Sequence, residues 1–415
     1  MHYALLTYGS MGDIRPFVAL AQGLQNKGHR VTLAAPENFK AFVEGFGVTY
    51  YPLAGNMEEL VNTEEVIRVI QSGNNFTFLR KLQKLADRTR AAIVAGLMEV
   101  SKDADVLITS TLNIFYVDAI ARHLHKKWAM MLPSPPMIET KEFPYPELDG
   151  LNFPAYNRLT YRLVNFAYWL AYKSRINALR ISLCLPPQIK NPLRQYVKDS
   201  VPTLFIFSPQ LIRRPDDWNA HCQITGFLTI NERAPIDPQL DKWLKAGAPP
   251  LYIGFGSIPI PDRKRLSAVI RELLATYRIV FCKGWSSLPD LPHHPNLFTL
   301  DQADHTWLLP RCKVAIHHGG AGTVGAALKA KTPSIVVSIF GDQAMWGKIV
   351  QRRSVGCHIP FKRLTAKKVL KAIRATTSPP ISPTVITIGE KVTMEDGVAN
   401  AIDKLTTWFN ESPKI

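Results

Sequence analysis

The chain has 415 residues, of which 46% are hydrophobic, and this length is enough for two domains that each bury their own core. Its 50 basic and 33 acidic residues give a formal net charge of +17, which favours anionic partners over long range. No dense basic run alternates with aromatic residues, so we expect no nucleic-acid partner. The five cysteines lie far apart and are odd in number, which argues against a zinc site, a disulfide framework and an oxidising compartment.

The first apolar run, residues 3–8, is too short for a signal peptide, and no stretch has the length needed to cross a bilayer. We therefore expect a cytoplasmic protein. Residues 3–7 are predicted to form a strand, and a helix follows until Gly28 stops it. Residues 31–34 form the next strand, which completes a βαβ unit.

The loop between this first strand and helix contains Ser10, Gly12 and Asp13. It lies at the carboxyl edge of the predicted sheet, where doubly wound folds bind their ligands. Asp13 therefore has two interpretations, a carboxylate that faces a ligand or a residue that caps the helix.

Short apolar runs predict five further strands before residue 230, and residues 76–100 are expected to be helical. Asp103-Ala104-Asp105 matches a metal-binding pattern, but no second ligand cluster accompanies it, so we expect a turn and no metal. A proline-rich segment from Pro133 to about Pro154 is expected to be an ordered loop or lid. The next helix, over residues 158–181, is rich in aromatic residues, which indicates core packing, an apolar acceptor wall or a surface resting on a membrane. The five strands are predicted at residues 48–52, 106–109, 128–132, 203–207 and 223–226.

After a proline-rich and charged stretch at residues 231–250, the pattern of strand and helix begins again. Strands are predicted over residues 251–255, 279–282 and 297–300, with a helix over residues 263–277. A last amphipathic helix is expected over residues 398–409.

The most informative stretch in this second half runs from Lys313 to Gly347. A buried strand over residues 314–316 leads through His317 and His318 into a glycine-rich turn and a helix. Glycines let a ligand approach the backbone, and the free N–H groups of a helix start favour an anion. We therefore predict a phosphate site at Gly320, Gly322 and Thr323, with Asp342 and Gln343 at the end of the next strand, residues 334–340, on the same edge.

Gly320, Gly322 and Gly325 also satisfy the GxGxxG pattern of dinucleotide-binding folds, with Asp342 as the ribose-binding acid. A nicotinamide-dependent oxidoreductase is therefore the first rival. The histidine pair before the turn and the glutamine after the acid fit that pattern poorly.

Together these elements predict an α/β protein with two Rossmann-like, doubly wound parallel-sheet domains that face each other across a cleft. The predicted organisation is residues 1–230 for a first domain, 231–250 for a linker, 251–390 for a second domain that contains the phosphate site, and 391–415 for a helical segment that packs back towards the first domain.

The ordered set of motifs resembles the family-one glycosyltransferases of the GT-B fold, especially the sterol 3-β-glucosyltransferases and the vancomycin-group antibiotic glycosyltransferases. The motifs that carry this resemblance are GSMGDIRPFVALAQGL, PPLYIGFGSIPIPD, KGW, TWLLPRC, HHGGAGT and FGDQAMWG.

The resemblance implies that residues 1–230 bind the acceptor and that residues 251–390 bind the nucleotide-sugar. It also implies that Asp13 is the general base, beside Ser10 and Gly12 in the donor and acceptor loop. His318 and the backbone of Gly320, Gly322 and Thr323 would hold the donor diphosphate, with Ser257 beside the phosphates. Trp285 would line the nucleotide, and Asp342 and Gln343 would take the hydroxyls of the sugar.

The implied activity is transfer from a UDP-sugar, most simply UDP-glucose, to a hydroxyl of an apolar small molecule, with inversion and without a metal or a bound cofactor. The acceptor could be a sterol, a flavonoid, a terpenoid or another natural product. It is not restricted to sterols, because Pro133-Ser134-Pro135 departs from the sterol-transferase pattern. The charge leaves room for a peripheral contact with an anionic membrane. A nucleotide-sugar epimerase and a membrane-binding protein without catalysis are further alternatives.

Overall fold

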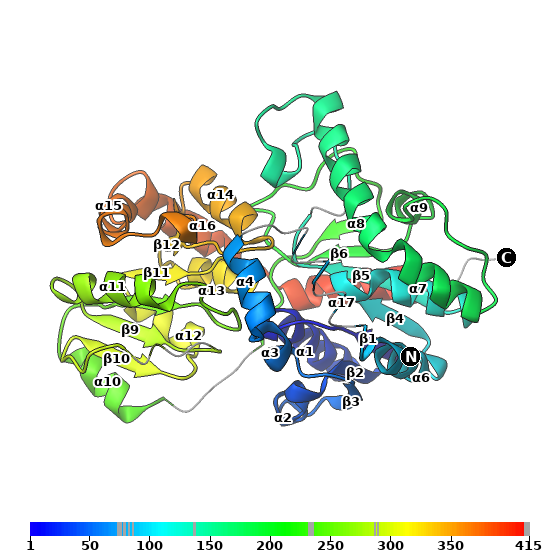
Figure 1. Ribbon diagram of the computed structural model, residues 1–415, viewed down its shortest axis with the longest axis horizontal. Coiled ribbons are helices and arrows are strands. Elements are labelled where there is room, and N and C mark those ends of the chain that lie inside the picture. Colours follow the sequence, from blue (N-terminus) through cyan, green and yellow to red (C-terminus); the bar gives the residue numbers. More distant parts are fainter. Residues whose placement is uncertain are drawn as a thin grey trace.

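Parallel strands form two separate sheets, one in each lobe of the molecule (Figure 1). The computed structural model describes residues 1–72, 77, 80–81, 84, 87–135, 138–230, 236–285, 288 and 290–410. The first sheet has seven strands in the order β3-β2-β1-β4-β5-β6-β7, and the second has six in the order β10-β9-β8-β11-β12-β13. The predicted class of two doubly wound parallel-sheet domains is confirmed.

The strands of the first sheet are short apolar runs, as expected where helices cover both faces of a parallel sheet. Every residue of the central strand β4 is buried. The strands are β1 (His2–Leu6), β2 (Arg30–Pro36), β3 (Thr49–Leu53), β4 (Val106–Thr109), β5 (Lys127–Leu132), β6 (Thr203–Phe205) and β7 (Cys222–Ile224).

The helices of the first lobe begin with α1 (Met11–Asn26), which ends where Gly28 adopts a φ of +80°. Of the helix predicted over residues 76–100, residues 76, 78–79, 82–83 and 85–86 lie outside the described part, while residues 87–89 form a turn before α6 (Arg90–Lys102). The other helical segments are η1 (Glu37–Phe39), α2 (Lys40–Gly45), α3 (Met57–Val61), α4 (Glu64–Ser72), η2 (Thr111–Asn113), α7 (Ile114–His123), η3 (Pro146–Leu148), α8 (Pro154–Ser182) and α9 (Leu193–Lys198).

In the second sheet, the strand predicted over residues 334–340 ends after three residues, although the N–H of Val337 still donates to the carbonyl of His317 at 2.7 Å. One edge strand was not predicted, because its three residues are not an apolar run. The strands are β8 (Leu251–Gly254), β9 (Ile279–Cys282), β10 (Leu297–Leu300), β11 (Val314–His317), β12 (Ser334–Val336) and β13 (Gly356–His358).

The second lobe contains helices on both faces of its sheet (Figure 1). Of the predicted linker, residues 231–235 lie outside the described part, and a helix, α10, occupies much of the remainder. The helical segments are α10 (Pro238–Lys245), α11 (Arg263–Leu274), α12 (His305–Leu308), η4 (Leu309–Arg311), α13 (Ala321–Lys329), α14 (Gln343–Arg352), η5 (Phe361–Arg363), α15 (Ala366–Thr376) and α16 (Ile381–Thr393).

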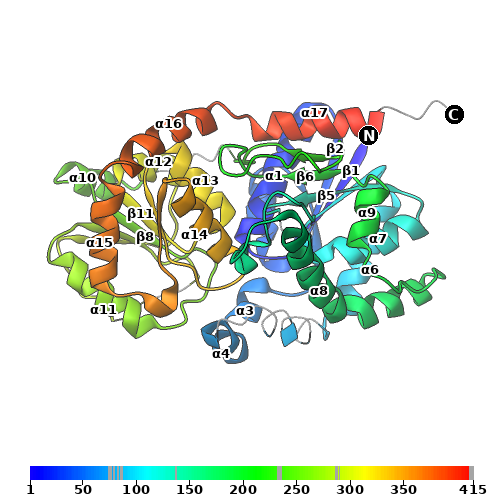
Figure 2. The same ribbon diagram turned by 90° about the horizontal axis from the view of Figure 1, so that it is seen from above.

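The last helix, α17 (Gly397–Asn410), returns to the first lobe and lies along α1 (Figure 2). The two helices approach closely at Gly23, where an added Cβ would fall 2.5 Å from a methyl group of Val398. The chain therefore crosses between the lobes twice. Within the described residues, no helix has both the length and the apolar character that crossing a bilayer would require.

Candidate active site

The start of α1 places the carboxylate of Asp13 at the carboxyl edge of the first sheet. Ser10 is the N-cap residue, and Asp13 is the third residue of the helix. The backbone N–H of Ser10 donates to Oδ2 of Asp13 at 2.8 Å, and the Ser10 hydroxyl lies 3.3 Å from the same oxygen. An added Cβ on Gly9 would lie 2.2 Å from that oxygen, so only glycine lets the carboxylate fold back over the loop. Asp13 thus contributes to the helix cap, but it is not the N-cap residue itself.

The environment of Asp13 makes it a better proton acceptor than an ordinary carboxylate. Burial is the main cause that raises its pKa to about 6; the negative charge of Asp342 acts in the same direction, and the hydrogen bonds from Ser10 act in the opposite direction. The side chain is nevertheless partly exposed. At pH 7 the group is therefore mostly ionised, and it takes up a proton more readily than a free aspartate does.

In the second lobe, a helix start with free backbone donors follows β11. Gly319 has a φ of +96°, and an added Cβ there would lie 2.5 Å from a methyl group of Val336. Gly320 is the N-cap residue of α13 and supplies no side chain to bond the first N–H groups. An added Cβ on Gly322 would meet nothing within 4 Å. The backbone at this helix start is thus open to an anion.

The two histidines before this turn have different roles. His317 is fully buried, with one ring nitrogen 3.1 Å from the Ser334 hydroxyl and the other accepting the N–H of Gly319 at 3.2 Å. His318 is half-buried, and its Nδ1 is buried without a hydrogen-bond partner among the described residues. Burial lowers the pKa of His318 to about 4. His318 is therefore a neutral imidazole with an unused polar atom at the start of α13.

Asp342 and Gln343 stand at the start of α14. Asp342 accepts a hydrogen bond from the indole of Trp346 at 3.2 Å, and burial raises its pKa to about 6. The side chain of Gln343 is buried, and its Oε1 accepts the backbone N–H groups of Ile339 and Phe340 at 2.8 and 3.3 Å. The glutamine carbonyl thus holds the preceding loop in place, and its amide nitrogen is the group left to donate to a ligand.

The turns after β8 and β9 carry Ser257 and Trp285 and pack directly against each other. Trp285 donates its backbone N–H to the carbonyl of Gly256 at 3.0 Å, and an added Cβ on Gly256 would lie 3.4 Å from the His318 ring. The Trp285 ring stacks on Phe39 of the first lobe, with 6.3 Å between centroids. Ser257, Trp285 and His318 therefore share one edge of the second sheet.

Residues of the two lobes face each other across this junction, where α13 and α14 lie on the side of the second lobe nearest α1 (Figure 2). The negative charge of Asp342 contributes to the raised pKa of Asp13 across the junction. Burial lowers the pKa of His305, and the charge of Arg15 in the first lobe lowers it as well. The side-chain amide of Gln71 donates to the carbonyl of Pro261 at 2.7 Å. The structure thus brings the predicted base and the predicted donor site to the same junction.

Two contributions to this junction were not predicted. Phe39 was not singled out, because nothing in its local sequence indicates a partner in the other lobe. Asp149 lies in the segment predicted as a loop or lid, and it accepts from Lys348 at 2.8 Å and pairs with Arg352, both on α14. The segment around Asp149 is therefore tied to the helix that begins at Gln343.

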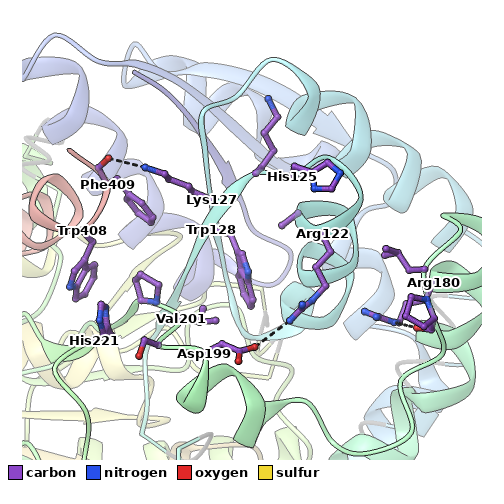
Figure 3. A pocket seen from close by; sticks show the side chains of 16 residues that line it. Arg122, His125, Lys127, Trp128, Arg180, Asp199, Val201, His221, Trp408 and Phe409 are labelled. Atoms are coloured by element: carbon purple, nitrogen blue, oxygen red, sulfur yellow. Dashed lines mark hydrogen bonds and ion pairs between the residues drawn. The ribbon is translucent and has the colours of Figure 1, made fainter. Parts of the chain in front are cut away.

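A basic hollow of about 800 Å³ lies at the opposite edge of the first sheet, where β5 begins (Figure 3). Arg122 donates to Asp118 at 2.7 Å, Arg180 pairs with the same carboxylate, and Lys127 donates to the carbonyl of Phe409 at 3.2 Å. None of the predicted site residues lines it. Because these cations already have partners within the protein, we infer that the hollow has a structural role, with Lys127 holding the end of α17.

Comparisons with known proteins identify the family of this chain. Residues 3–116 match the glycosyltransferase family 28 N-terminal domain, and residues 272–386 match the erythromycin biosynthesis protein CIII-like C-terminal domain. A sterol 3-beta-glucosyltransferase of Arabidopsis thaliana is 34% identical over 97% of this chain and 64% of its own length. A second one from the same plant is 32% identical over 96% of this chain and 67% of its own length. The chain belongs to the sterol 3-beta-glucosyltransferase family of glycosyltransferases.

The predicted resemblance to that family is thus confirmed. This glycosyltransferase spans about two thirds of its plant relatives, but only 27% of a relative from Cryptococcus neoformans, with which it shares 30% identity over 98% of its own length.

Solved structures confirm the GT-B fold of this glycosyltransferase. The kitacinnamycin glycotransferase superimposes with a TM-score of 0.72 at 16% identity, covering 98% of both chains. The glycosyltransferase VinC, solved in complex with DTDP, superimposes with a TM-score of 0.67 at 16% identity, covering 99% of this chain and 100% of VinC.

Proposed function

We propose that this glycosyltransferase moves a sugar, most simply glucose, from a UDP-sugar to a hydroxyl of an apolar small molecule, with inversion at the anomeric carbon. The observation that carries the proposal is the pairing of Asp13 in one lobe with Asp342 and the start of α13 in the other. This arrangement offers a proton acceptor and an anion-binding helix start at one junction. The similarity to the sterol 3-beta-glucosyltransferases of Arabidopsis thaliana supports the glucosyl transfer.

On the acceptor side, Asp13 receives the proton of the attacking hydroxyl. A carboxylate whose pKa is about 6 does not remove an alcohol proton in advance. It accepts the proton as the oxygen bonds to the anomeric carbon and becomes acidic. The hydrogen bonds from Ser10 to Oδ2 fix the carboxylate while this happens.

On the donor side, the bond between the anomeric carbon and the diphosphate breaks, and its electron pair leaves with UDP. The N–H groups at the start of α13 and the neutral His318 ring are proposed to stabilise that departing charge. Attack from the face opposite the diphosphate converts an α-linked donor into a β-glycoside. The DTDP complex of VinC supports a nucleoside diphosphate as the ligand class.

The donor hydroxyls are assigned to Asp342 and to the amide nitrogen of Gln343. We propose that no metal takes part, and a transfer rate that is unchanged by EDTA is the expected result. The relatives' names favour a sterol acceptor, while flavonoids and terpenoids remain in the acceptor class because of Pro133-Ser134-Pro135.

The test is a mass-spectrometric screen of UDP-glucose against sterols, flavonoids and terpenoids, with the Asp13→Asn variant as the matched control. The expected result is a gain of one hexose on at least one acceptor, together with release of UDP. Interconversion of UDP-sugars without any acceptor would indicate an epimerase. Binding of reduced nicotinamide cofactor without a response to UDP would indicate an oxidoreductase.

A further inference from the structure

Helix α8 presents an apolar stripe to solvent along one face. Leu159, Leu163, Phe166 and Leu170 recur at the spacing that places side chains on one side of a helix. They are 49%, 55%, 59% and 53% exposed. Residues packed inward, such as Tyr161 and Tyr172, come from the opposite side of the same helix. The helix therefore has two apolar sides, one buried in the core and one exposed to solvent. This explains why apolar residues occur around its whole circumference in the sequence.

The stripe continues into the segment before the helix. Leu151 and Phe153 are 56% and 50% exposed, and the Phe153 ring packs against Tyr156 with 5.6 Å between centroids. The Tyr156 hydroxyl donates to the carbonyl of Leu148 at 2.8 Å, so this tip is fixed to α8. The tip and the amino end of α8 project from the first lobe (Figure 1). We call Leu151, Phe153 and the four stripe residues the α8 apolar face.

The charge of the helix indicates what covers this face. Its 29 residues include five basic side chains and no acidic one. Arg158 and Arg162, next to the stripe, each keep about half of the side chain exposed, although they pair with Asp217 and Glu139. The whole chain carries a net charge of +17. An apolar face beside exposed cations is typical of a helix that lies in the interface of an anionic membrane.

The same charge disfavours a second copy of this chain as the occupant. A two-fold contact would set identical faces against each other, and each face would bring basic side chains without acidic partners on the helix. An anionic lipid surface meets both the apolar and the cationic requirement.

We propose that the α8 apolar face docks this glycosyltransferase onto an anionic lipid bilayer. The proposal rests on the proposed function for its purpose, because an apolar acceptor dissolves in the bilayer and has to reach the junction between the lobes. Asp149 joins the tip to α14, which begins at the proposed sugar-binding residues. Docking at the tip therefore brings the membrane surface close to that junction.

The experiment is sedimentation of the purified chain with phosphatidylcholine vesicles that contain or lack phosphatidylserine. The wild type is expected to sediment with the anionic vesicles, and the Leu163→Gln/Phe166→Gln double variant is expected to lose at least about tenfold in partitioning. Ile386→Gln is the matched control, because Ile386 is 49% exposed on α16. This helix belongs to the second lobe and lies away from α8 (Figure 2). This control is expected to sediment as the wild type does. The Arg158→Gln/Arg162→Gln double variant should bind more weakly to vesicles that contain phosphatidylserine, and its binding to vesicles without phosphatidylserine should not change.

Equal sedimentation of the double variant and the wild type would overturn the proposal. So would a wild-type dimer in analytical ultracentrifugation that the double variant abolishes, since the face would then be an interface between copies. Hexose transfer to an acceptor dispersed in cyclodextrin should be the same for the wild type and the double variant. Vesicle binding that depends on the α8 apolar face, in a chain that transfers no hexose to any acceptor, would refute the proposed function and leave the docking surface intact.

Discussion

The charge of Asp342, at the start of α14 in the second lobe, raises the pKa of Asp13, near the start of α1 in the first. Burial raises the pKa of each carboxyl to about 6. An acid of the second lobe thus raises the proton affinity of an acid of the first lobe at the junction. In the proposed mechanism, Asp13 takes up the proton of the attacking hydroxyl, while Asp342 binds the sugar of the donor.

Replacing Asp13 with Asn should abolish most of the turnover. We expect kcat to fall by at least about a hundredfold, the usual scale for a positioned base. The Asn side-chain oxygen can still accept the N–H of Ser10, so the thermal midpoint should change little. Calorimetry should show wild-type affinity for UDP. A variant that glycosylates at the wild-type rate would leave Asp13 with a capping role alone.

The pH dependence of kcat/KM should report the raised pKa of Asp13. Because the base acts in its ionised form, activity should fall as the pH drops through about 6. Asp342→Asn removes a negative charge that raises this pKa, so the acidic limb of the profile should move to lower pH in that variant, even though its maximal rate is reduced. A limb that stays in place would show that the two carboxyls are not coupled.

His318 should couple UDP binding to proton uptake. Burial lowers its pKa to about 4, and the charge of a bound diphosphate would favour the protonated ring and raise that pKa. His318→Ala should weaken UDP binding by about tenfold to a hundredfold, the scale of a lost hydrogen bond to a charged group. The gain in UDP affinity between pH 7 and pH 5 should also be smaller in the variant. The titration of UDP itself cancels in this comparison. Unchanged UDP affinity by calorimetry would remove the assigned role.

Loss of the Asp149 bridge should loosen the lid segment rather than the chemistry. Lys348 and Arg352 hold the pKa of Asp149 below its ordinary value, so both ion pairs persist at neutral pH. Asp149→Asn should raise KM for the acceptor several-fold, because partly exposed pairs contribute up to about 1 kcal/mol each. The value of kcat should stay close to that of the wild type. Arg213→Gln is a suitable control, since it removes an exposed ion pair with Asp216 that does not join the lobes.

The basic hollow should affect stability and not donor binding. Lys127 donates to the carbonyl of Phe409 at the end of α17, so Lys127→Met should lower the free energy of unfolding by about 0.3–1 kcal/mol. Lys126→Met, which alters a neighbouring cation without that contact, should have a smaller effect. Denaturant titration measures both. If Lys127→Met weakened UDP binding, the hollow would be a ligand site.

The fold was predictable because most strands are short apolar runs, as at residues 106–109 and 279–282. In addition, Gly28 marks the end of α1, and the glycines before α13 mark the start of that helix. Strand β13 was missed because Gly356, Cys357 and His358 lack that pattern, and their place depends on pairing with β12. The aromatic residues of α8 left its surface open to three interpretations. Exposure alone separates Trp169, in the core, from Phe166, in solvent.

The members of the candidate site could be named from motifs, but their environment could not. Nothing local to Asp13 reveals that Asp342 faces it from the other lobe, or that Gly9 leaves room for its carboxylate. The carbonyl of Gln343 turns back to its own loop, a detail that depends on the position of Ile339 and Phe340. The stacking of Phe39 on Trp285 likewise depends on how the two lobes approach each other.

The most direct test of the two-lobe site is a crystal structure of the protein with UDP bound. The proposed two-lobe mechanism predicts the diphosphate within hydrogen-bond distance of the N–H groups of Gly322 and Thr323 and of His318, with the Asp13 carboxylate facing it from the first lobe. A diphosphate bound elsewhere, such as in the basic hollow beside Lys127, with the start of α13 left empty, would contradict it.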